Sequence, residues 1–175
     1  MYDLNIPGYM SEEELQSISE IAAQVPENGV IVELGSYKGR SAVAWASSCH
    51  PSVTVYCIDV FAPMDFSEPD FFDEFKENTK HLPNIVQIRG LCPMILDYPG
   101  DSIDVFFNDA AHYNPNDWKN IEYFRKYIKL GGLLMGHDYQ VNQFPDVVIN
   151  VRRLERELNQ PVTTYPGGFM YSFRI

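Results

Sequence analysis

The chain has 175 residues and a formal net charge of −11 at pH 7, a length that suits one domain over residues 1–175. Hydrophobic residues make up 45% and charged residues 21%, which is typical of a folded globular protein and excludes a disordered chain. No apolar run approaches the ~20 residues of a membrane span, and the first residues lack the features of a secretory signal. The acidity also argues against nucleic acid or an anionic membrane as a partner.

Hydrophobic periodicity divides the chain into alternating helices and strands. The first helix is expected to begin at a capping box formed by Ser11 and Glu14. Helices are predicted at residues 11–25, 39–48, 70–80, 114–128 and 145–158, and strands at residues 30–32, 53–58, 85–88, 103–107, 133–135, 161–165 and 169–175.

Two local signals define the fourth helix and the strand after it. Asn114 followed by Pro115 is expected to open the helix, with the asparagine as its cap and the proline at its first position. An apolar stripe is expected to continue as far as Ile128. Gly131 and Gly132 are then expected to form the turn into the next strand.

Strands that alternate with helices indicate the α/β class. We expect a doubly wound, mostly parallel seven-stranded sheet with one antiparallel C-terminal strand. In such sheets ligands bind beyond the carboxyl ends of the strands. Glu33, Asp59, Asp109, His137 and Asp138 all follow or end predicted strands, so the sequence predicts a polar site at this edge.

The turn after the first strand is the most informative segment. Gly35 and Gly39 allow a sharp turn and a close approach by a ligand. A dinucleotide-binding motif would need glycines at the positions of Tyr37 and Arg40, and a phosphate-binding P-loop would need a glycine at Leu34. Neither motif is present, and the remaining pattern suits a ligand with a cationic end and no pyrophosphate.

Segment 30–41, VIVELGSYKGRS, resembles motif I of the class I S-adenosylmethionine-dependent methyltransferases. Segments 106–112, FFNDAAH, and 130–139, LGGLLMGHDY, resemble a subfamily in which an "iDaaH" segment precedes "GG…GHDY". The resemblance covers essentially the whole chain. It implies methyl transfer from S-adenosylmethionine to a small-molecule acceptor. A hydroxyl of a sugar-like or other small metabolite is favoured, because the site is rich in His and Asp and lacks the Pro-Pro-aromatic segment of amino-group methylases.

The resemblance also implies a cofactor site. Its expected members are Glu33, Gly35, Ser36, Tyr37, Gly39, Ser41, Asp59 and Asp109. Backbone N–H groups at the start of the second helix would suit the carboxylate of the methionine end, and Asp59 would accept from the ribose hydroxyls. Residues 90–92 are expected near the adenine, whereas Lys38 and Arg40 are expected to be solvated.

The chemistry at the acceptor has two open alternatives. In cation-dependent relatives, an Asp after the fourth strand and an acidic pair after the fifth bind the metal, and a second carboxylate is the base. Here a divalent cation would be held by Asp109, His137 and Asp138, with Ala111 in the place of the base. The other alternative uses no metal, with His112 as the general base and Asp109 as the second catalytic residue.

Four further expectations concern the rival function, the oligomeric state, the location and a lid. A non-catalytic nucleoside-binding module of the same fold is the rival function, and a homo-oligomer is left open. Three cysteines without CxxC spacing fit a reducing cytoplasm. A lid over the site is expected from the N-terminal helix, from residues 139–145 or from the loop at 61–70. The aromatic and Met side chains around that loop are Phe61, Met64, Phe66, Phe71 and Phe72.

Overall fold

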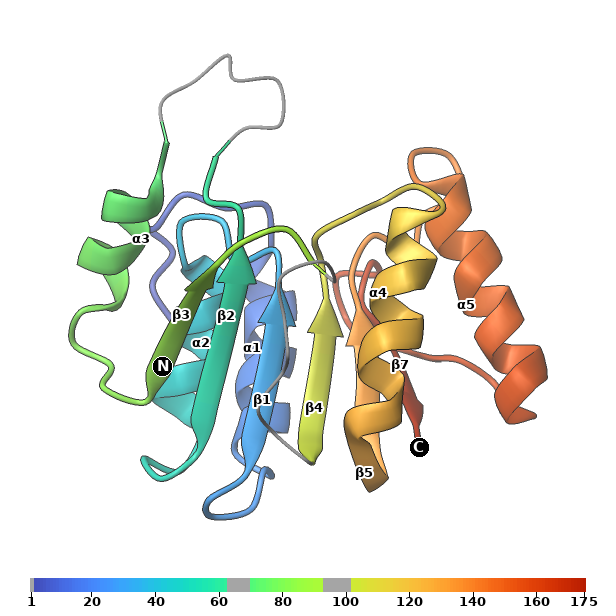
Figure 1. Cartoon of the computed structure of the whole chain (residues 1–175), viewed down its shortest axis with the longest axis horizontal. Helices are drawn as coiled ribbons and strands as arrows, with labels where there is room; N and C mark the ends of the chain where they lie inside the picture. Colours follow the sequence, from blue (N-terminus) through green and yellow to red (C-terminus); the bar gives the residue numbers. More distant parts are fainter. Residues whose placement is uncertain (1, 63–69, 93–101) are drawn as a thin grey trace.

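The computed structural model describes residues 2–62, 70–92 and 102–175. Seven strands form one sheet in the order β3-β2-β1-β4-β5-β7-β6, and Figure 1 shows helices alternating with them along the chain. The strands are β1 (Val30–Leu34), β2 (Thr54–Asp59), β3 (Ile85–Arg89), β4 (Ile103–Asn108), β5 (Ile128–Gly136), β6 (Thr163–Thr164) and β7 (Tyr171–Arg174). The helices are α1 (Glu12–Ala22), α2 (Arg40–Ser48), α3 (Phe72–Thr79), α4 (Asn116–Phe124), the 3-10 turn η1 (Arg125–Tyr127) and α5 (Pro145–Leu158).

The sheet has the predicted architecture. β3, β2, β1, β4 and β5 pair in parallel, and β7 is antiparallel to both β5 and β6. Parallel strands carry their carboxyl ends to one edge, so the turns after β1, β2, β4 and β5 meet there (Figure 1). The α/β, doubly wound, seven-stranded prediction is confirmed.

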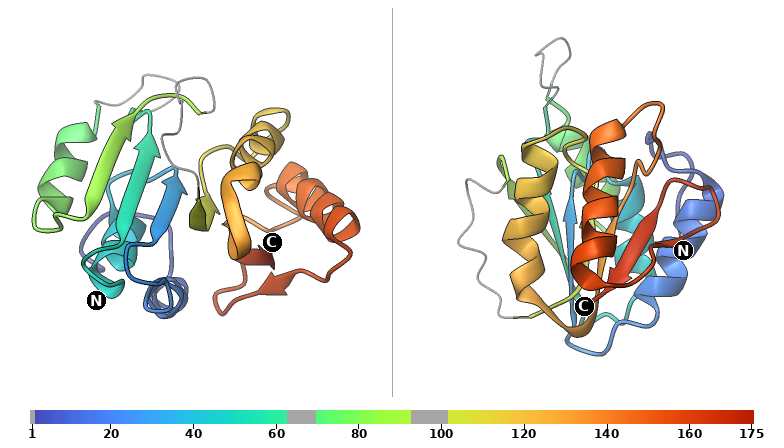
Figure 2. Two further views of the ribbon diagram at one scale, coloured as in Figure 1. Left: turned by 60° about the horizontal axis from the view of Figure 1, so that its bottom comes forward. Right: turned by 90° about the vertical axis from the view of Figure 1, so that its right-hand side faces the viewer.

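Helices cover both faces of the sheet. Side chains alternate across a strand: in β1, Ile31 packs with α1, α2 and α3, whereas Val32 and Leu34 pack with α4 and α5. In the right-hand view of Figure 2, α1 and α4 lie on opposite sides of the sheet. The two apolar layers hold the strands so that their ends form a fixed rim.

The fourth helix differs from its prediction at both ends. It begins at Asn116 and ends at Phe124, and no side chain of the described residues caps it. The Oδ1 atom of Asn114 instead accepts a hydrogen bond of 2.9 Å from Asn150. Ile128, predicted on the helix face, is the first residue of β5, because the 3-10 turn shortens the helix and returns the chain to the sheet.

The two glycines predicted as a turn lie inside β5. The pairing of β4 with β5 shifts register, since Ile103 faces Ile128 but Val105 faces Leu133. The extra residues of β5 therefore bulge out of the ladder, and Gly131 adopts a positive φ of 85° there. A bulge of this kind extends the strand through a segment that local sequence signals mark as a turn.

Two further observations concern the state of the cysteines and the length and polarity of the helices. Cys49, Cys57 and Cys92 are all free thiols, and the first two are buried. Within residues 2–62, 70–92 and 102–175, every helix is too short or too polar to cross a bilayer.

Candidate active site

A cavity of about 850 Å³ opens at the carboxyl edge of the sheet. Its walls come from the ends of β1, β2, β4 and β5, from α4 and from the N-terminal segment before α1. The lining side chains used below are Tyr9, Tyr37, Asp59, Cys92, Asp109, His112, His137, Asp138 and Phe169. A cavity of this volume is large enough for a drug-sized ligand.

The turn after β1 leaves the backbone bare at the cavity wall. Gly35 has a φ of +85°, and a Cβ atom there would lie 2.1 Å from the backbone oxygen of Asp109. Only glycine therefore fits between the ends of β1 and β4. Tyr37 follows with a positive φ of 45°, and its ring lines the cavity.

Asp59 joins the first turn to the end of β2. Its two carboxylate oxygens each accept a backbone N–H, from Tyr37 at 2.7 Å and from Phe61 at 2.7 Å. Burial raises the pKa of this carboxyl, and the backbone donors oppose that shift. The backbone N–H of Val60 is a third donor at this carboxylate, and the group can still accept one further hydrogen bond at the cavity wall.

The predicted cofactor residues divide into three groups. Gly35, Tyr37, Asp59 and Asp109 line the large cavity. Ser36 and Ser41 line a second cavity of about 40 Å³ beside it. Glu33 and Gly39 line neither of these cavities among the described residues: a Cβ on Gly39 would meet Thr79 and Phe75, and Glu33 is completely buried.

Glu33 is a buried carboxyl group behind the first turn. Within the described part of the chain, neither carboxyl oxygen has a well-aligned hydrogen-bond partner. The Ser36 and Ser41 hydroxyls are nevertheless close enough to lower the pKa of the group. Burial is the largest influence and, with the nearby Asp109 and Asp59, raises the pKa of Glu33 to about 7. The side chain is therefore poised between its neutral and charged forms near neutral pH.

Arg40 does not lie in solvent as expected. Its guanidinium donates to the backbone oxygens of Leu4, Ile6 and Met10 at 3.1, 2.6 and 3.0 Å. These contacts hold residues 4–10, which we call the N-terminal strap, against the start of α2. The sequence offers no signal for this role, because the three acceptors are backbone atoms.

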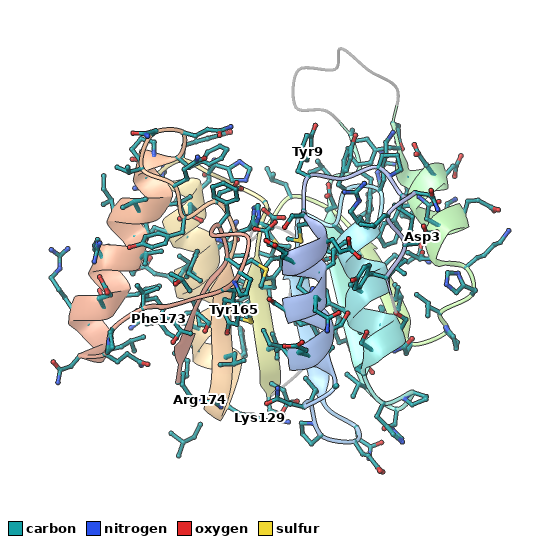
Figure 3. The ribbon with its side chains drawn as sticks, turned by 180° about the vertical axis from the view of Figure 1, so that it is seen from behind. Asp3, Tyr9, Lys129, Tyr165, Phe173 and Arg174 are labelled. Carbon is teal, nitrogen blue, oxygen red and sulfur yellow. The ribbon has the colours of Figure 1, made fainter. Side chains whose placement is uncertain are left out.

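The strap brings Tyr9 to the mouth of the site. Tyr9 is 90% exposed, its ring centre lies 5.9 Å from that of Tyr37, and it lines both cavities. Figure 3 shows it at the end of the molecule where the strands terminate, opposite Lys129 and Arg174. The chain before α1 is thus one of the walls. Among the described residues, α1 itself lines neither cavity, and the lid expected from the N-terminal helix stays a prediction.

Two acids and a histidine meet after β4 and β5. The Nε2 atom of His112 lies 2.7 Å from an oxygen of Asp138 and 3.8 Å from one of Asp109. The ring N–H has no well-aligned acceptor among the described residues, so these contacts are ion pairs. Asp109 and Asp138 raise the pKa of His112 to about 9. Burial opposes ionisation of Asp138, but His112 and His137 lower its pKa.

His137 lies between the same acids and a residue from α1. Its Nδ1 atom is 3.2 Å from Asp138 and 3.7 Å from Asp109, and its Nε2 atom is 3.0 Å from Glu14. Burial opposes the charge of the ring, but Asp138 and Glu14 raise the pKa of His137 to about 10. Glu14 was predicted only as part of a capping box, a role that it also fills. Its contact with His137 could not be inferred from a local pattern.

The three residues expected to hold a metal converge. One ligand atom from each of Asp109, His137 and Asp138 lies within 4.8 Å of the others. Two carboxylate oxygens and an imidazole nitrogen form a borderline donor set, which suits Mn, Fe, Co or Zn as well as Mg. The residues present therefore fit a divalent cation.

The aromatic loop differs from the expected lid. Phe61 is completely buried and packs against Phe71, Phe72 and Phe75, with ring centres 6.4, 4.7 and 4.7 Å away. The expectation of a lid face is wrong for Phe61, because its side chain belongs to the core. Met64 and Phe66 lie outside the described residues.

Comparison with known proteins agrees with the geometry. A family model described as "Methyltransferase domain" matches residues 32–139, and no curated protein matches the chain significantly. Among solved structures, the O-methyltransferase NovP has a TM-score of 0.72 and 16% identity, over 93% of this chain and 79% of that one. An S-adenosylmethionine-dependent O-methyltransferase from Thermotoga maritima has a TM-score of 0.69 and 15% identity, over 97% and 67%. CalS11, a TDP-rhamnose 3'-O-methyltransferase, has a TM-score of 0.68 and 18% identity, over 92% and 76%.

At these identities the structural likeness establishes the fold, whereas the family match covers more than half of the chain. That match shows the family, and the family implies S-adenosylmethionine as the methyl donor. The chain belongs to the class I methyltransferase family, whose members use S-adenosylmethionine.

Proposed function

We propose that the chain transfers the methyl group of S-adenosylmethionine to a hydroxyl of a small-molecule acceptor, with His112 as the general base. A divalent cation held by Asp109, His137 and Asp138 is part of the proposal. The observation that carries it is the convergence of this cluster on the same cavity of about 850 Å³ that reaches Asp59. Donor and acceptor would thus share one enclosed space.

The donor side of the cavity fits S-adenosylmethionine. Gly35 lines the cavity with its backbone, and the absence of a Cβ lets the ends of β1 and β4 lie close together there. The carboxylate of Asp59 at the cavity wall suits a ribose hydroxyl, and the wall at residues 90–92 suits the adenine. Ser36 and Ser41, at the smaller cavity, are near the start of α2, where backbone N–H groups suit the methionine carboxylate. Glu33 and Gly39 would act from behind this wall.

The acceptor side supplies the chemistry. Bound S-adenosylmethionine provides an activated methyl group on a positively charged sulfur. As the methyl carbon passed from sulfur to the acceptor oxygen, His112 would take the hydroxyl proton. The main contribution of the protein is the alignment of the two reactants, with roughly 10²–10⁴-fold more from the base.

The protonation of His112 connects the base to the proposed cation. In the ligand-free protein, Asp109 and Asp138 hold a proton on the ring, since they raise its pKa to about 9. A bound cation would polarise the acceptor hydroxyl and offset the charge of these two acids. His112 could then lose its proton at neutral pH and accept one from the acceptor.

One named structure supports a sugar-like acceptor, and a second supports O-methylation. NovP is an O-methyltransferase, and CalS11 methylates TDP-rhamnose at its 3'-hydroxyl. The acceptor side of this cavity offers amide and aromatic side chains, Asn116, Gln140, Gln143 and Phe144, which can hydrogen-bond hydroxyls and stack on a ring. A cytoplasmic location belongs to the same proposal, because all three cysteines are free.

The proposal is tested by methyl transfer from labelled S-adenosylmethionine to a panel of sugars, nucleotide sugars and phenols. We expect turnover of at least one hydroxyl acceptor, its loss with chelator and its recovery with Mn²⁺ or Mg²⁺. His112→Ala should lower kcat about 10²–10⁴-fold while the affinity for S-adenosylhomocysteine stays the same. His50→Ala is the matched control, because His50 is exposed and contacts Ser52 away from the cavity.

Each failure has its own meaning. If turnover survives chelator but is lost in His112→Ala, the proposed cation is wrong and the proposed base is supported. Activity that survives both treatments leaves alignment alone as the mechanism. Cofactor binding without turnover of any acceptor would favour the non-catalytic module.

A further inference from the structure

Glu14 is a buried acid that contacts the proposed cation site at His137 and that the proposed function does not use. It lies at the third position of α1 and is 1% exposed. The turn between β6 and β7 encloses it, since a Cβ on Gly167 would lie 2.5 Å from its Cγ atom. A carboxylate so deeply enclosed needs partners for both oxygens.

The two oxygens of Glu14 have different partners. One accepts from the backbone N–H of Ser11 at 2.9 Å and from its hydroxyl at 3.0 Å, which completes the capping box. The other lies 3.0 Å from the Nε2 atom of His137. The helix cap therefore holds Glu14 in one orientation and directs its second oxygen at a residue 123 positions away in the chain.

This contact fixes which nitrogen of His137 faces the site. A carboxylate only accepts hydrogen bonds, so the proton between the two side chains belongs to Nε2. The other nitrogen, Nδ1, faces Asp138 at 3.2 Å and Asp109 at 3.7 Å. The packing of the ring against Phe169, with ring centres 6.1 Å apart, adds to this restraint.

We propose that Glu14 is a positioning residue for the cation site: it holds the Nε2–H of His137 and so presents Nδ1 as the ligand nitrogen. The inference rests on the cation site of the proposed function. Histidine ligands commonly donate their second N–H to a carboxylate, which fixes the ring and makes it a better donor to the metal. Here that carboxylate is supplied by a helix cap.

Glu14→Gln tests the inference. The cap still requires an oxygen facing Ser11, so the amide NH₂ must face Nε2 of His137. That nitrogen would then have to accept, so the neutral ring that a cation needs would carry its one proton on Nδ1, where it blocks the ligand position. We expect the dissociation constant for Mn²⁺, measured by calorimetry on the full chain, to rise about 10–100-fold.

Ser11→Ala is the matched control. It removes the hydroxyl from the cap but leaves the backbone donor and the Glu14–His137 contact in place. We expect its Mn²⁺ affinity to stay within about twofold of the original protein, even where its melting temperature falls. A role that is only structural would weaken Mn²⁺ binding in both variants in step with their stability.

A second measurement reports on His137 directly. In Zn²⁺-loaded protein with ¹⁵N-labelled histidine, we expect a protonated Nε2 and an unprotonated, metal-bound Nδ1, and loss of this pattern in Glu14→Gln. Mn²⁺ binding unchanged in Glu14→Gln would overturn the inference and leave the cation site standing. No Mn²⁺ binding by the original protein at millimolar concentration would overturn both.

Discussion

Glu33 is a carboxyl group whose environment opposes its charge. It is enclosed at the end of β1, and burial raises its pKa to about 7, from an ordinary 4.5. Between these values the folded protein keeps a proton that the unfolded chain releases. Stability must therefore fall as pH rises from about 4.5 to about 7, the reverse of the usual behaviour of a paired carboxylate.

Glu33→Gln isolates this effect. The amide has nearly the shape of the protonated acid and no charge at any pH. The free energy of unfolding of the variant, relative to the original protein, should increase by about 2–3 kcal/mol between pH 5 and pH 8, as measured by urea unfolding. Glu20→Gln, at an exposed position of α1, should show no such trend. A constant difference across this range would mean that Glu33 is already charged in the folded protein.

At the scale of single elements, the N-terminal strap depends on one side chain of α2. Arg40 donates to three backbone oxygens of the strap. A hydrogen bond from a charged donor contributes about 1.5–3 kcal/mol. Ile6 and Met10 of the strap are also buried, but the strap precedes the first helix or strand of the described residues, so its local stability should depend strongly on Arg40.

Arg40→Lys should loosen the strap without unfolding the sheet. Lysine keeps the charge but cannot reach three separate acceptors as the planar guanidinium does. We expect amide hydrogen exchange in a peptide covering residues 2–10 to become about tenfold faster or more, with exchange in β1 and β4 unchanged. Arg152→Lys, on the exposed face of α5, is the control. Equal exchange in both variants would show that other contacts hold the strap.

The helices and strands also differ in how well the local sequence predicts their ends. The strands and most helices follow apolar periods that are local, and α1 begins at its predicted capping box. The start of β5 was missed because its pairing with β4 includes a bulge at Gly131, and sheet pairing outweighs the turn signal. The cap predicted for α4 failed because Asn114 hydrogen-bonds with α5 instead.

At the scale of the whole molecule, some residues of the site follow from local sequence signals, whereas others depend on contacts between distant segments. The acids at strand ends were predictable, because a parallel sheet brings all such ends to one edge. Glu14 and Arg40 were not. One contacts a side chain 123 positions away, and the other binds backbone oxygens 30 to 36 positions away. Such partners depend on tertiary packing and carry no local pattern.

Because one cavity joins the strap, four strand ends and the C-terminal turn, a ligand there should stabilise the entire fold. S-adenosylhomocysteine at 100 times its dissociation constant should add about 2.7 kcal/mol. For a domain of this size that raises the melting temperature by roughly 5–10 °C. NADH should have no effect, since the first turn lacks a dinucleotide motif.

Asp59→Asn should reduce that shift, because it removes the charge that would face the ribose hydroxyls and costs about 1.5–3 kcal/mol of binding. Its control is Asp104→Asn, which replaces another structural aspartate, paired with Lys129 at 2.8 Å and with the backbone of Val30. Lys129 lies at the end of the molecule opposite Tyr9 (Figure 3). Asp104→Asn should therefore lower the melting temperature of the free protein but preserve the rise caused by the ligand. An equal loss of the rise in both variants would mean that Asp59 acts on general stability and makes no contact with the cofactor.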